Sequence, residues 1–485
     1  KVTALNLTSG ADLNITTGTG DIESSGELKS TGGNIAVEAT EGTVNLKKIN
    51  ANKDAKVVST KGAINIAEGL SGTNLNVLAT EGKVTALNLT SGADLNITTG
   101  SGDIESSGEL KSTGGNIAVE ATAEGDINLN KVNANKNISI KTKKGIINLA
   151  TLSAGDNSII KTTKGDVKII DLESVNNVDI SSDDGKISNS GHIKSSQKDV
   201  KVQTNKGDVK LNDIYAEKNA TIGSQNGFVD IGLVNGENVR VIANDPDNGL
   251  KTGKVIAGKS YMVTGNNVDI GELKQRTGYE NMLTFSPKGT GNGPINTLNL
   301  KNISVSSKYG LMIENLWAHK AEIYLDGDKF YLPEVKIIDV AHFRNKDTMA
   351  SVYGTPPVRE GLNTEIYFNP NTTGWMKLNF EGGKKVITDG VLLRNDNYYG
   401  VHNERFSGVN LTNEILNNNQ DKFSNIQHKE NDFSFIQNNI LGNKSLIEYS
   451  NIDSLFAGMT KANIELNTSN SNGISLAPEE VELNF

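Results

Sequence analysis

The first half of the chain repeats one pattern of apolar and polar positions around regularly spaced glycines. Around most of these glycines, aliphatic residues lie 7 and 5 positions before the glycine and 2, 4 and 7 positions after it, with mostly Lys, Asn, Asp, Ser and Thr between them. A spacing of two, apolar on one face and polar on the other, is the period of a β-strand and not of a helix. Around Gly207 the aliphatic positions are Val200, Val202, Val209, Leu211 and Ile214.

The glycines that mark this pattern follow one another at intervals of 20 to 23 residues, which is typical of a solenoid. We predict an all-β, right-handed parallel β-helix with about 20 residues per rung, two strands in each rung and often a third near position +7. We expect the glycines to supply a positive φ at a polar corner. The structural turn glycines are Gly20, Gly42, Gly62, Gly82, Gly102, Gly125, Gly145, Gly165, Gly185, Gly207 and Gly227.

A long internal duplication is superimposed on the short repeat. Residues 1–40 recur at 83–122 with one change, Thr19 to Ser101, so that the copies are 82 residues apart. Four smaller units fill this distance. Each rung buries its apolar side chains only against the rungs above and below, so we expect stability to grow as rungs are added.

The aromatic residues divide the chain into further parts. Residues 1–214 contain no Phe, Tyr or Trp, so a narrow aliphatic core is expected there. We predict a regular shaft over 1–243, an irregular β-helix continuation over 244–345, a mixed β cap segment over 346–410, and an Asn-rich C-terminal tail over 411–485. The tail is expected to be partly helical or loosely docked. Because residue 1 falls within the repeat, we interpret the chain as part of a longer protein.

Composition excludes several classes of function. There is no Cys, which excludes disulfide frameworks, Cys-ligated metals and thiol catalysis. The net charge of −9 disfavours nucleic acid as a partner. No apolar run is long enough for a membrane-spanning helix, so the chain is predicted not to span a membrane.

The repeat, its Asn/Lys/Thr-rich turns and the near-identical tandem copies resemble the shafts of two-partner-secretion exoproteins of the filamentous haemagglutinin type, over roughly residues 1–345. Among these, leukotoxin-type filamentous adhesins of anaerobic bacteria are the most similar. The Asn369-Pro370-Asn371 sequence matches the family's secretion motif but lies far from an N-terminal secretion domain, and we interpret it as a turn. The Cys-closed loop of some members is absent.

The resemblance implies a secreted adhesin on the surface of a Gram-negative-type bacterium. It would be exported by an outer-membrane transporter of the two-partner type and would bind a receptor or glycan on host cells, other bacteria or matrix. Three alternatives stay open: a structural component of a biofilm matrix or filament, a leukotoxin-like exotoxin, and, with less support, a polysaccharide lyase or hydrolase.

Candidate binding residues are few and lie in the aromatic-rich C-terminal part. Exposed rings there could stack on sugars, although packing in a widening core or a cap explains most of them. The candidates are Trp317, Trp375, Tyr398, Tyr399 and His402.

No catalytic or metal site is predicted. The five histidines lack metal-ligand spacing and are expected to be surface or capping residues. No phosphate-binding loop or nucleophile elbow occurs. A catalytic site is an irregularity, whereas the rungs are nearly regular through residue 227, and only the region after Asn244 is irregular enough to contain one. We therefore predict no enzymatic activity and no cofactor.

Overall fold

The computed structural model describes residues 1–245, 249–291, 293–305, 310–314 and 316–323 in full, and the backbone of residues 324–325 and of further strands up to Ala477. It divides into two compact units, Lys1–Asp245 and Pro246–Phe485. The described residues contain β-strands and no helix, and nearly all strand pairs are parallel. The predicted all-β parallel solenoid is confirmed.

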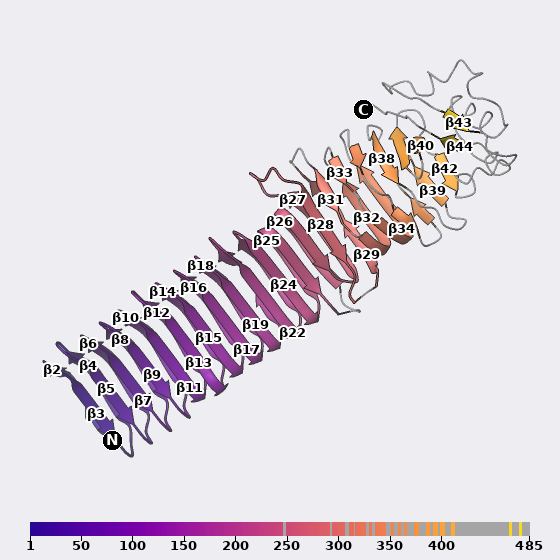
Figure 1. The fold of residues 1–485 in the computed structure, drawn as a ribbon. Coiled ribbons are helices and arrows are strands. Elements are labelled where there is room, and N and C mark those ends of the chain that lie inside the picture. Colours follow the sequence, from indigo (N-terminus) through magenta and orange to yellow (C-terminus); the bar gives the residue numbers. More distant parts are fainter. Residues whose placement is uncertain are drawn as a thin grey trace. The chain divides into compact units, whose positions relative to one another are not determined.

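In unit 1, each turn of the chain contributes one strand before the turn glycine and one after it, which we name the incoming and outgoing strands. Each strand pairs with the equivalent strand of the next turn, so that β5 pairs with β7 and β6 with β8 (Figure 1). The incoming strands are β3 (Leu13–Thr17), β5 (Ile35–Ala39), β7 (Ala55–Ser59), β9 (Leu75–Ala79), β11 (Leu95–Ser101), β13 (Ile117–Glu124), β15 (Ile138–Lys144), β17 (Ser158–Lys164), β19 (Val178–Asp184), β22 (Val200–Lys206) and β24 (Asn219–Asn226).

The outgoing strands contain a bend, because their buried residues follow a spacing of two, then three, then two. The third strand predicted near position +7 is therefore the second half of the outgoing strand. These strands are β1 (Val2–Ala4), β2 (Leu7–Ser9), β4 (Ile22–Ser30), β6 (Val44–Ala51), β8 (Ile64–Ser71), β10 (Val84–Ser91), β12 (Ile104–Ser112), β14 (Ile127–Ala134), β16 (Ile147–Ala154), β18 (Val167–Ser174), β20 (Ile187–Asn189), β21 (His192–Ser195), β23 (Val209–Ala216) and β25 (Val229–Ala243).

The core of unit 1 is a column of aliphatic side chains. The five positions predicted around Gly207 are all buried, as are the equivalent residues around Gly145 and Gly42. Buried hydroxyls three positions before many turn glycines add polar links, because Thr204 and Ser224 donate to the carbonyl of the preceding turn glycine at 2.8 and 2.7 Å. These bonds satisfy the two buried hydroxyls and link each rung to the one before it.

An Asn/Asp ladder runs along the corner before the incoming strands. Asn157 Oδ1 accepts hydrogen bonds from the backbone N and from Nδ2 of Asn177, both at 3.0 Å. Asp54 Oδ1 accepts from Asn74 N at 3.0 Å and from Thr73 Oγ1 at 2.6 Å. These side chains satisfy turn amides that the strand ladder leaves unpaired.

The turn glycines stack on one another. This stacking explains why glycine occupies these positions better than the predicted positive φ does. A positive φ is found at Gly20, Gly125, Gly145, Gly165 and Gly207 but not at the other six, where the prediction was wrong. At every turn glycine after the first, a Cβ would lie 1.9 to 2.5 Å from the carbonyl oxygen of the preceding turn glycine. The close approach between the backbones of successive turns is therefore the shared reason for glycine at these positions.

Unit 2 is also built mainly from parallel strands, and aromatic rings are part of its core. Tyr261 and Phe285 are fully buried and stack with ring centroids 5.3 Å apart. The strands described with side chains are β26 (Gly249–Thr264), β27 (Asn267–Gln275), β28 (Leu283–Lys288), β29 (Ile295–Leu300), β30 (Ile303–Ser304), β31 (Leu311–Ile313) and, up to Ile323, β32 (Leu316–Leu325).

The later strands of unit 2 are described by their backbone, and their pairings are both parallel and antiparallel. Most of the tail over 411–485 lies outside the described residues, so its expected partly helical character stays a prediction, although Leu411 itself is in a strand. The strands are β33 (Lys329–Tyr331), β34 (Val335–Asn345), β35 (Ser351–Tyr353), β36 (Pro357–Arg359), β37 (Asn363–Glu365), β38 (Thr373–Lys377), β39 (Lys385–Thr388), β40 (Val391–Asn395), β41 (Tyr398–His402), β42 (Val409–Thr412), β43 (Glu465–Asn467) and β44 (Ser475–Ala477).

Candidate binding surfaces

A pocket in unit 2 contains one of the aromatic residues that the sequence singles out. Trp317, at the start of β32, is 36% exposed and lines a pocket of about 450 Å³. Exposure of an indole ring beside a pocket is typical of a binding surface, because the ring offers apolar area together with an N–H donor. The other lining residues are Met262, Ser286, Pro287, Lys288, Gly289, Gly291, Gly293 and Glu314.

Two paired strands and a glycine-rich turn build this pocket. β26 and β28 pair in parallel, which aligns Met262 with Ser286. β28 is then followed by a turn whose described residues are 289–291 and Gly293. Asn266 holds this turn, because its Oδ1 accepts hydrogen bonds from Thr290 N at 3.1 Å and from Thr290 Oγ1 at 2.6 Å. Gly291 has a φ of 64°, in the left-handed region that favours glycine.

The polar groups of the pocket are a carboxylate, a hydroxyl and an ammonium group. Ser286 Oγ donates to Glu314 Oε2 at 3.1 Å, and the backbone N of Glu314 donates to Phe285 O at 2.8 Å, so the carboxylate is held in place. Lys288 is exposed at the end of β28. An indole ring, a fixed carboxylate and a glycine-rich turn can recognise a ligand with one apolar face and several hydroxyls, such as a sugar.

The other four candidate residues lie in β38 and β41, where only the backbone is described. These strands pair antiparallel, with Trp375 opposite Gly400, Tyr399 opposite Met376 and Tyr398 opposite Lys377. The backbone therefore brings the strand segments of Trp375, Tyr398, Tyr399 and His402 together. Their side chains lie outside the described residues, so their role in binding stays a prediction.

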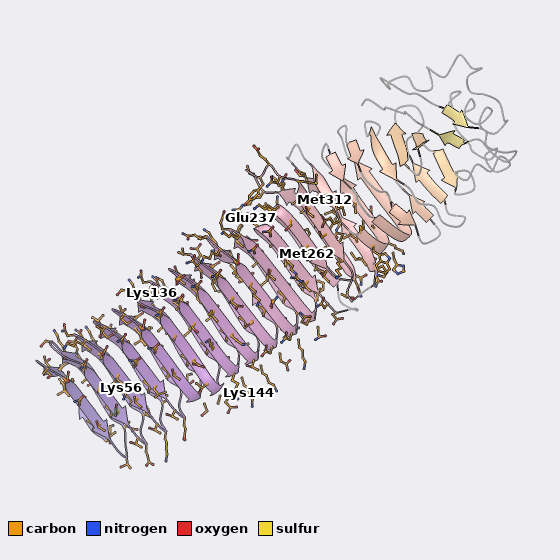
Figure 2. All side chains as sticks on the ribbon, viewed as in Figure 1. Lys56, Lys136, Lys144, Glu237, Met262 and Met312 are labelled. Carbon is orange, nitrogen blue, oxygen red and sulfur yellow. The ribbon has the colours of Figure 1, made fainter. Side chains whose placement is uncertain are left out.

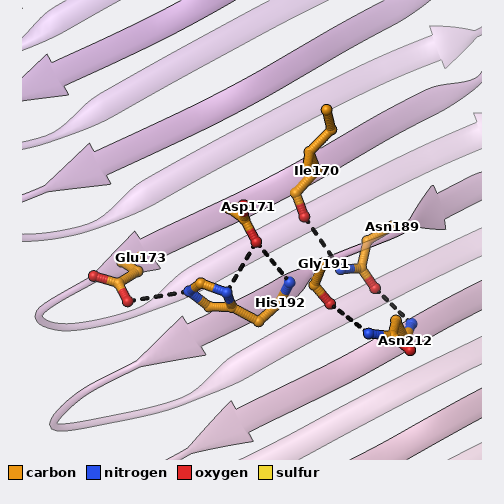
Figure 3. Close-up of polar contacts among 7 residues, drawn as sticks. All are labelled: Ile170, Asp171, Glu173, Asn189, Gly191, His192 and Asn212. Atoms are coloured by element: carbon orange, nitrogen blue, oxygen red, sulfur yellow. Dashed lines mark hydrogen bonds and ion pairs between the residues drawn. The ribbon is translucent and has the colours of Figure 1, made fainter.

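His192 marks a break in the regular rungs of unit 1. Here the outgoing strand is split into β20 and β21, and the imidazole lies between two carboxylates of the preceding turn (Figure 3). Its Nδ1 is 2.9 Å from Asp171 Oδ1 and its Nε2 is 3.0 Å from Glu173 Oε1, while its backbone N donates to the same Asp171 oxygen at 3.0 Å. These contacts clamp the split strand to the rung before it.

A groove along the bend of the outgoing strands was missed by the sequence analysis. One part of about 640 Å³ extends over β12, β14, β16, β18 and β20, and an equivalent part of about 480 Å³ extends over β4, β6, β8 and β10. Ser107 lines both parts. Leu87 and Ile170, which stand five positions after their turn glycines, are 43% and 49% exposed there. In the sequence, the signal that could have predicted the groove was the presence of aliphatic residues at this outward-facing repeat position.

Amide side chains alternate with the apolar residues of the groove. Asn65 Nδ2 donates to Asn45 Oδ1 at 2.6 Å, and Asn148 Nδ2 donates to Asn128 Oδ1 at 2.7 Å. Each pair joins neighbouring rungs and leaves further amide hydrogen-bonding capacity toward the groove. The groove therefore offers amide and aliphatic contacts along the direction of stacking, together with a few charged side chains.

The described residues contain no group of three or more His, Asp or Glu side chains able to hold a metal ion. In the same part of the chain, no helix has the length and apolar character required to cross a membrane.

One comparison with known proteins gives a match. The Toastrack DUF4097 family model matches residues 5–122, about a quarter of the chain, and its fold is also a β-helix-like repeat. No curated protein matches the chain. No solved structure matches it either.

Proposed function

We propose that this protein is a secreted, cell-surface adhesin in which the β-helical rungs act as a stalk and the C-terminal part carries the binding surface. The observation that carries the proposal is the exposed Trp317 ring beside a pocket with a fixed carboxylate. The pocket supports a glycan on a host cell, another bacterium or matrix as the ligand, because sugars combine an apolar ring face with hydroxyls.

The stacked rungs support the stalk role. At about 4.8 Å for each rung, the eleven turn glycines of unit 1 correspond to about 50 Å of stacked backbone. Nearest-neighbour packing also allows rungs to form one after another as the chain emerges. This property suits export through an outer-membrane transporter of the two-partner type, which we propose as the secretion route.

The test is a titration of the full chain with soluble glycans, followed by tryptophan fluorescence. The chain has two tryptophans, so the Trp375→Phe variant reports on Trp317 alone. We expect ligand binding to shift the Trp317 emission, Trp317→Ala to weaken cell or glycan binding at least tenfold, and Trp317→Phe to weaken it less.

Leu78→Ala is the matched control, because Leu78 is an exposed apolar residue (39%) of unit 1. It should bind like the wild type. Equal binding by the wild type and Trp317→Ala would contradict the assignment of this pocket. Absence of any cell or glycan binding would favour a structural filament component, for which the similar rung surfaces of unit 1 are suitable.

A further inference from the structure

Five lysines gather on the outward face and turn edge of two neighbouring incoming strands, β15 and β17. We name them the lysine band: Lys141, Lys143, Lys144, Lys161 and Lys164. We propose that the lysine band binds a linear acidic polysaccharide. This surface is separate from the Trp317 pocket, and the proposal goes beyond the adhesin function.

The register of the two strands places like charges side by side. Lys141 is aligned with Lys161 and Lys144 with Lys164, and adjacent strands of a sheet are about 4.8 Å apart. All five side chains are exposed. In Figure 2, Lys144 projects from the opposite edge of the unit to Lys136, which precedes β15 and is not part of the band.

Elsewhere, several lysines form ion pairs with carboxylates of neighbouring rungs. Lys56 is 2.7 Å from Glu38 Oε1, and Lys186 is 3.0 Å from Asp208 Oδ2. Among the described residues, none of the five band lysines takes part in such a pair. Lysines that do include Lys1, Lys48, Lys56, Lys61, Lys83, Lys131, Lys186, Lys254 and Lys301.

The band is a local reversal of charge in an acidic chain. Residues 131–168 contain eight Lys and two Asp, whereas residues 1–125 contain nine Lys and fifteen Asp or Glu. Like charges directly opposite each other on neighbouring strands are destabilising, and here they recur at two positions of the same strand pair. A bound polyanion would remove this repulsion, so the arrangement fits a partner with several negative charges in a row.

The surroundings of the band favour a narrow polyanion over a nucleic acid. Exposed Glu120 is aligned with Lys141 on one side, and exposed Asp184 is aligned with Lys164 on the other. A duplex, with about one charge per 1.7 Å, is wider than the two strands and would place phosphates against these carboxylates. Single-stranded nucleic acid would lack its usual stacking partners, because no aromatic residue occurs before Tyr215. A single polysaccharide chain with carboxylate or sulfate groups fits between the acidic flanks.

The experiment measures binding of the full chain to polygalacturonate and dextran sulfate in 50 mM salt, with neutral dextran as the uncharged reference. The test variant is Lys141→Gln/Lys161→Gln. The matched control is Lys47→Gln/Lys53→Gln, which removes two exposed lysines from the acidic part of the same unit. We expect binding to both acidic polymers and not to dextran. The test variant should bind roughly tenfold or more weakly with a smaller salt dependence, and the control should match the wild type.

Hydrogen exchange provides a readout that does not depend on overall affinity. Bound polymer should slow exchange in residues 138–164 more than in residues 35–59. Equal binding by test and control variants, or equal protection of both segments, would overturn the proposal. Stronger binding to single-stranded DNA or polyglutamate of similar charge would reassign the partner to another class of macromolecule. Loss of binding in Trp317→Ala alone would assign the polysaccharide to the other pocket.

Discussion

The stack of turn glycines predicts a large effect from adding a single methyl group. In Gly62→Ala, the new Cβ would lie 2.2 Å from Gly42 O and 2.4 Å from Gly42 C, with no positive φ involved. Ordinary contacts begin at about 3.4 Å, so the two turns would have to separate locally by about 1 Å. Overpacking of this kind costs about 1–3 kcal/mol. In Gly165→Ala, the same clash at 2.0 Å is combined with a φ of 144°, which adds about 1–2 kcal/mol.

The neighbouring hydrogen bonds raise this cost. Lys61 N donates to Thr40 O at 3.1 Å and Val44 N donates to Ala63 O at 2.9 Å, and separation of the turns would weaken such bonds, each contributing about 1 kcal/mol. We expect Gly62→Ala to lower the free energy of local opening by about 2–4 kcal/mol and Gly165→Ala by about 3–6 kcal/mol.

Hydrogen exchange measured by mass spectrometry is the assay, because it reports opening of individual rungs rather than of the whole chain. Gly18→Ala is the control, since no atom lies within 4 Å of a Cβ at that glycine. It should be neutral or stabilise by about 0.5 kcal/mol. If Gly62→Ala exchanges like Gly18→Ala in residues 55–71, close approach between turns is not the reason for glycine at these positions.

Three further predictions follow from buried or bridging polar groups. Asn157→Ala should destabilise the neighbouring rungs by about 1–3 kcal/mol in denaturant unfolding, because two donors of the next turn lose their acceptor, whereas Asn157→Asp should retain most of the stability. The Thr73 hydroxyl and the Asn74 amide lower the pKa of Asp54 below its usual value, so stability should fall as the pH drops below about 4. Asp54→Asn should reduce that fall by less than about 1 kcal/mol, as the carboxylate is largely solvated, and an unchanged acid profile would argue against the linkage. Burial raises the pKa of Tyr261, and its hydroxyl forms no well-aligned hydrogen bond. Tyr261→Phe should therefore keep or raise the melting temperature, because it removes a buried hydroxyl without a partner. A marked decrease in the melting temperature would contradict this expectation.

The regular rungs of unit 1 were predictable from the sequence. Buried residues alternate with exposed ones along each strand, and they recur at the same offsets from the turn glycine in successive rungs. Ile138, Ile140 and Ile147 were assigned to the core from their offsets to Gly145, and all three are fully buried. The physical role of the glycines was harder to predict, since the clash involves the backbone of a residue about 20 positions away. Sequence pattern gives the period of stacking but not the distance between the backbones of successive turns.

The binding surfaces were only partly predictable. Trp317 was a candidate from its residue type, but its pocket depends on the pairing of β26 with β28 and on the Asn266 contact to the next turn. The groove depends on the bend within the outgoing strands. In the sequence, the only sign of this bend is one extra residue between two buried positions of the strand. The charge of the lysine band is visible in the sequence, whereas the register that aligns Lys141 with Lys161 requires the stacked turns.

The 82-residue duplication spans a whole number of turns, and this has a consequence for how such a gene can change. Ile22 and Ile104 are both fully buried and occupy the same place in their rungs. Unequal recombination between the copies would add or delete whole blocks of four turns. The first and last rungs of such a block would pack on the flanking rungs in the same way as the existing ones do. The length of the stacked rungs could thus change between related proteins in steps of about 20 Å, without further substitutions in the core to restore its packing.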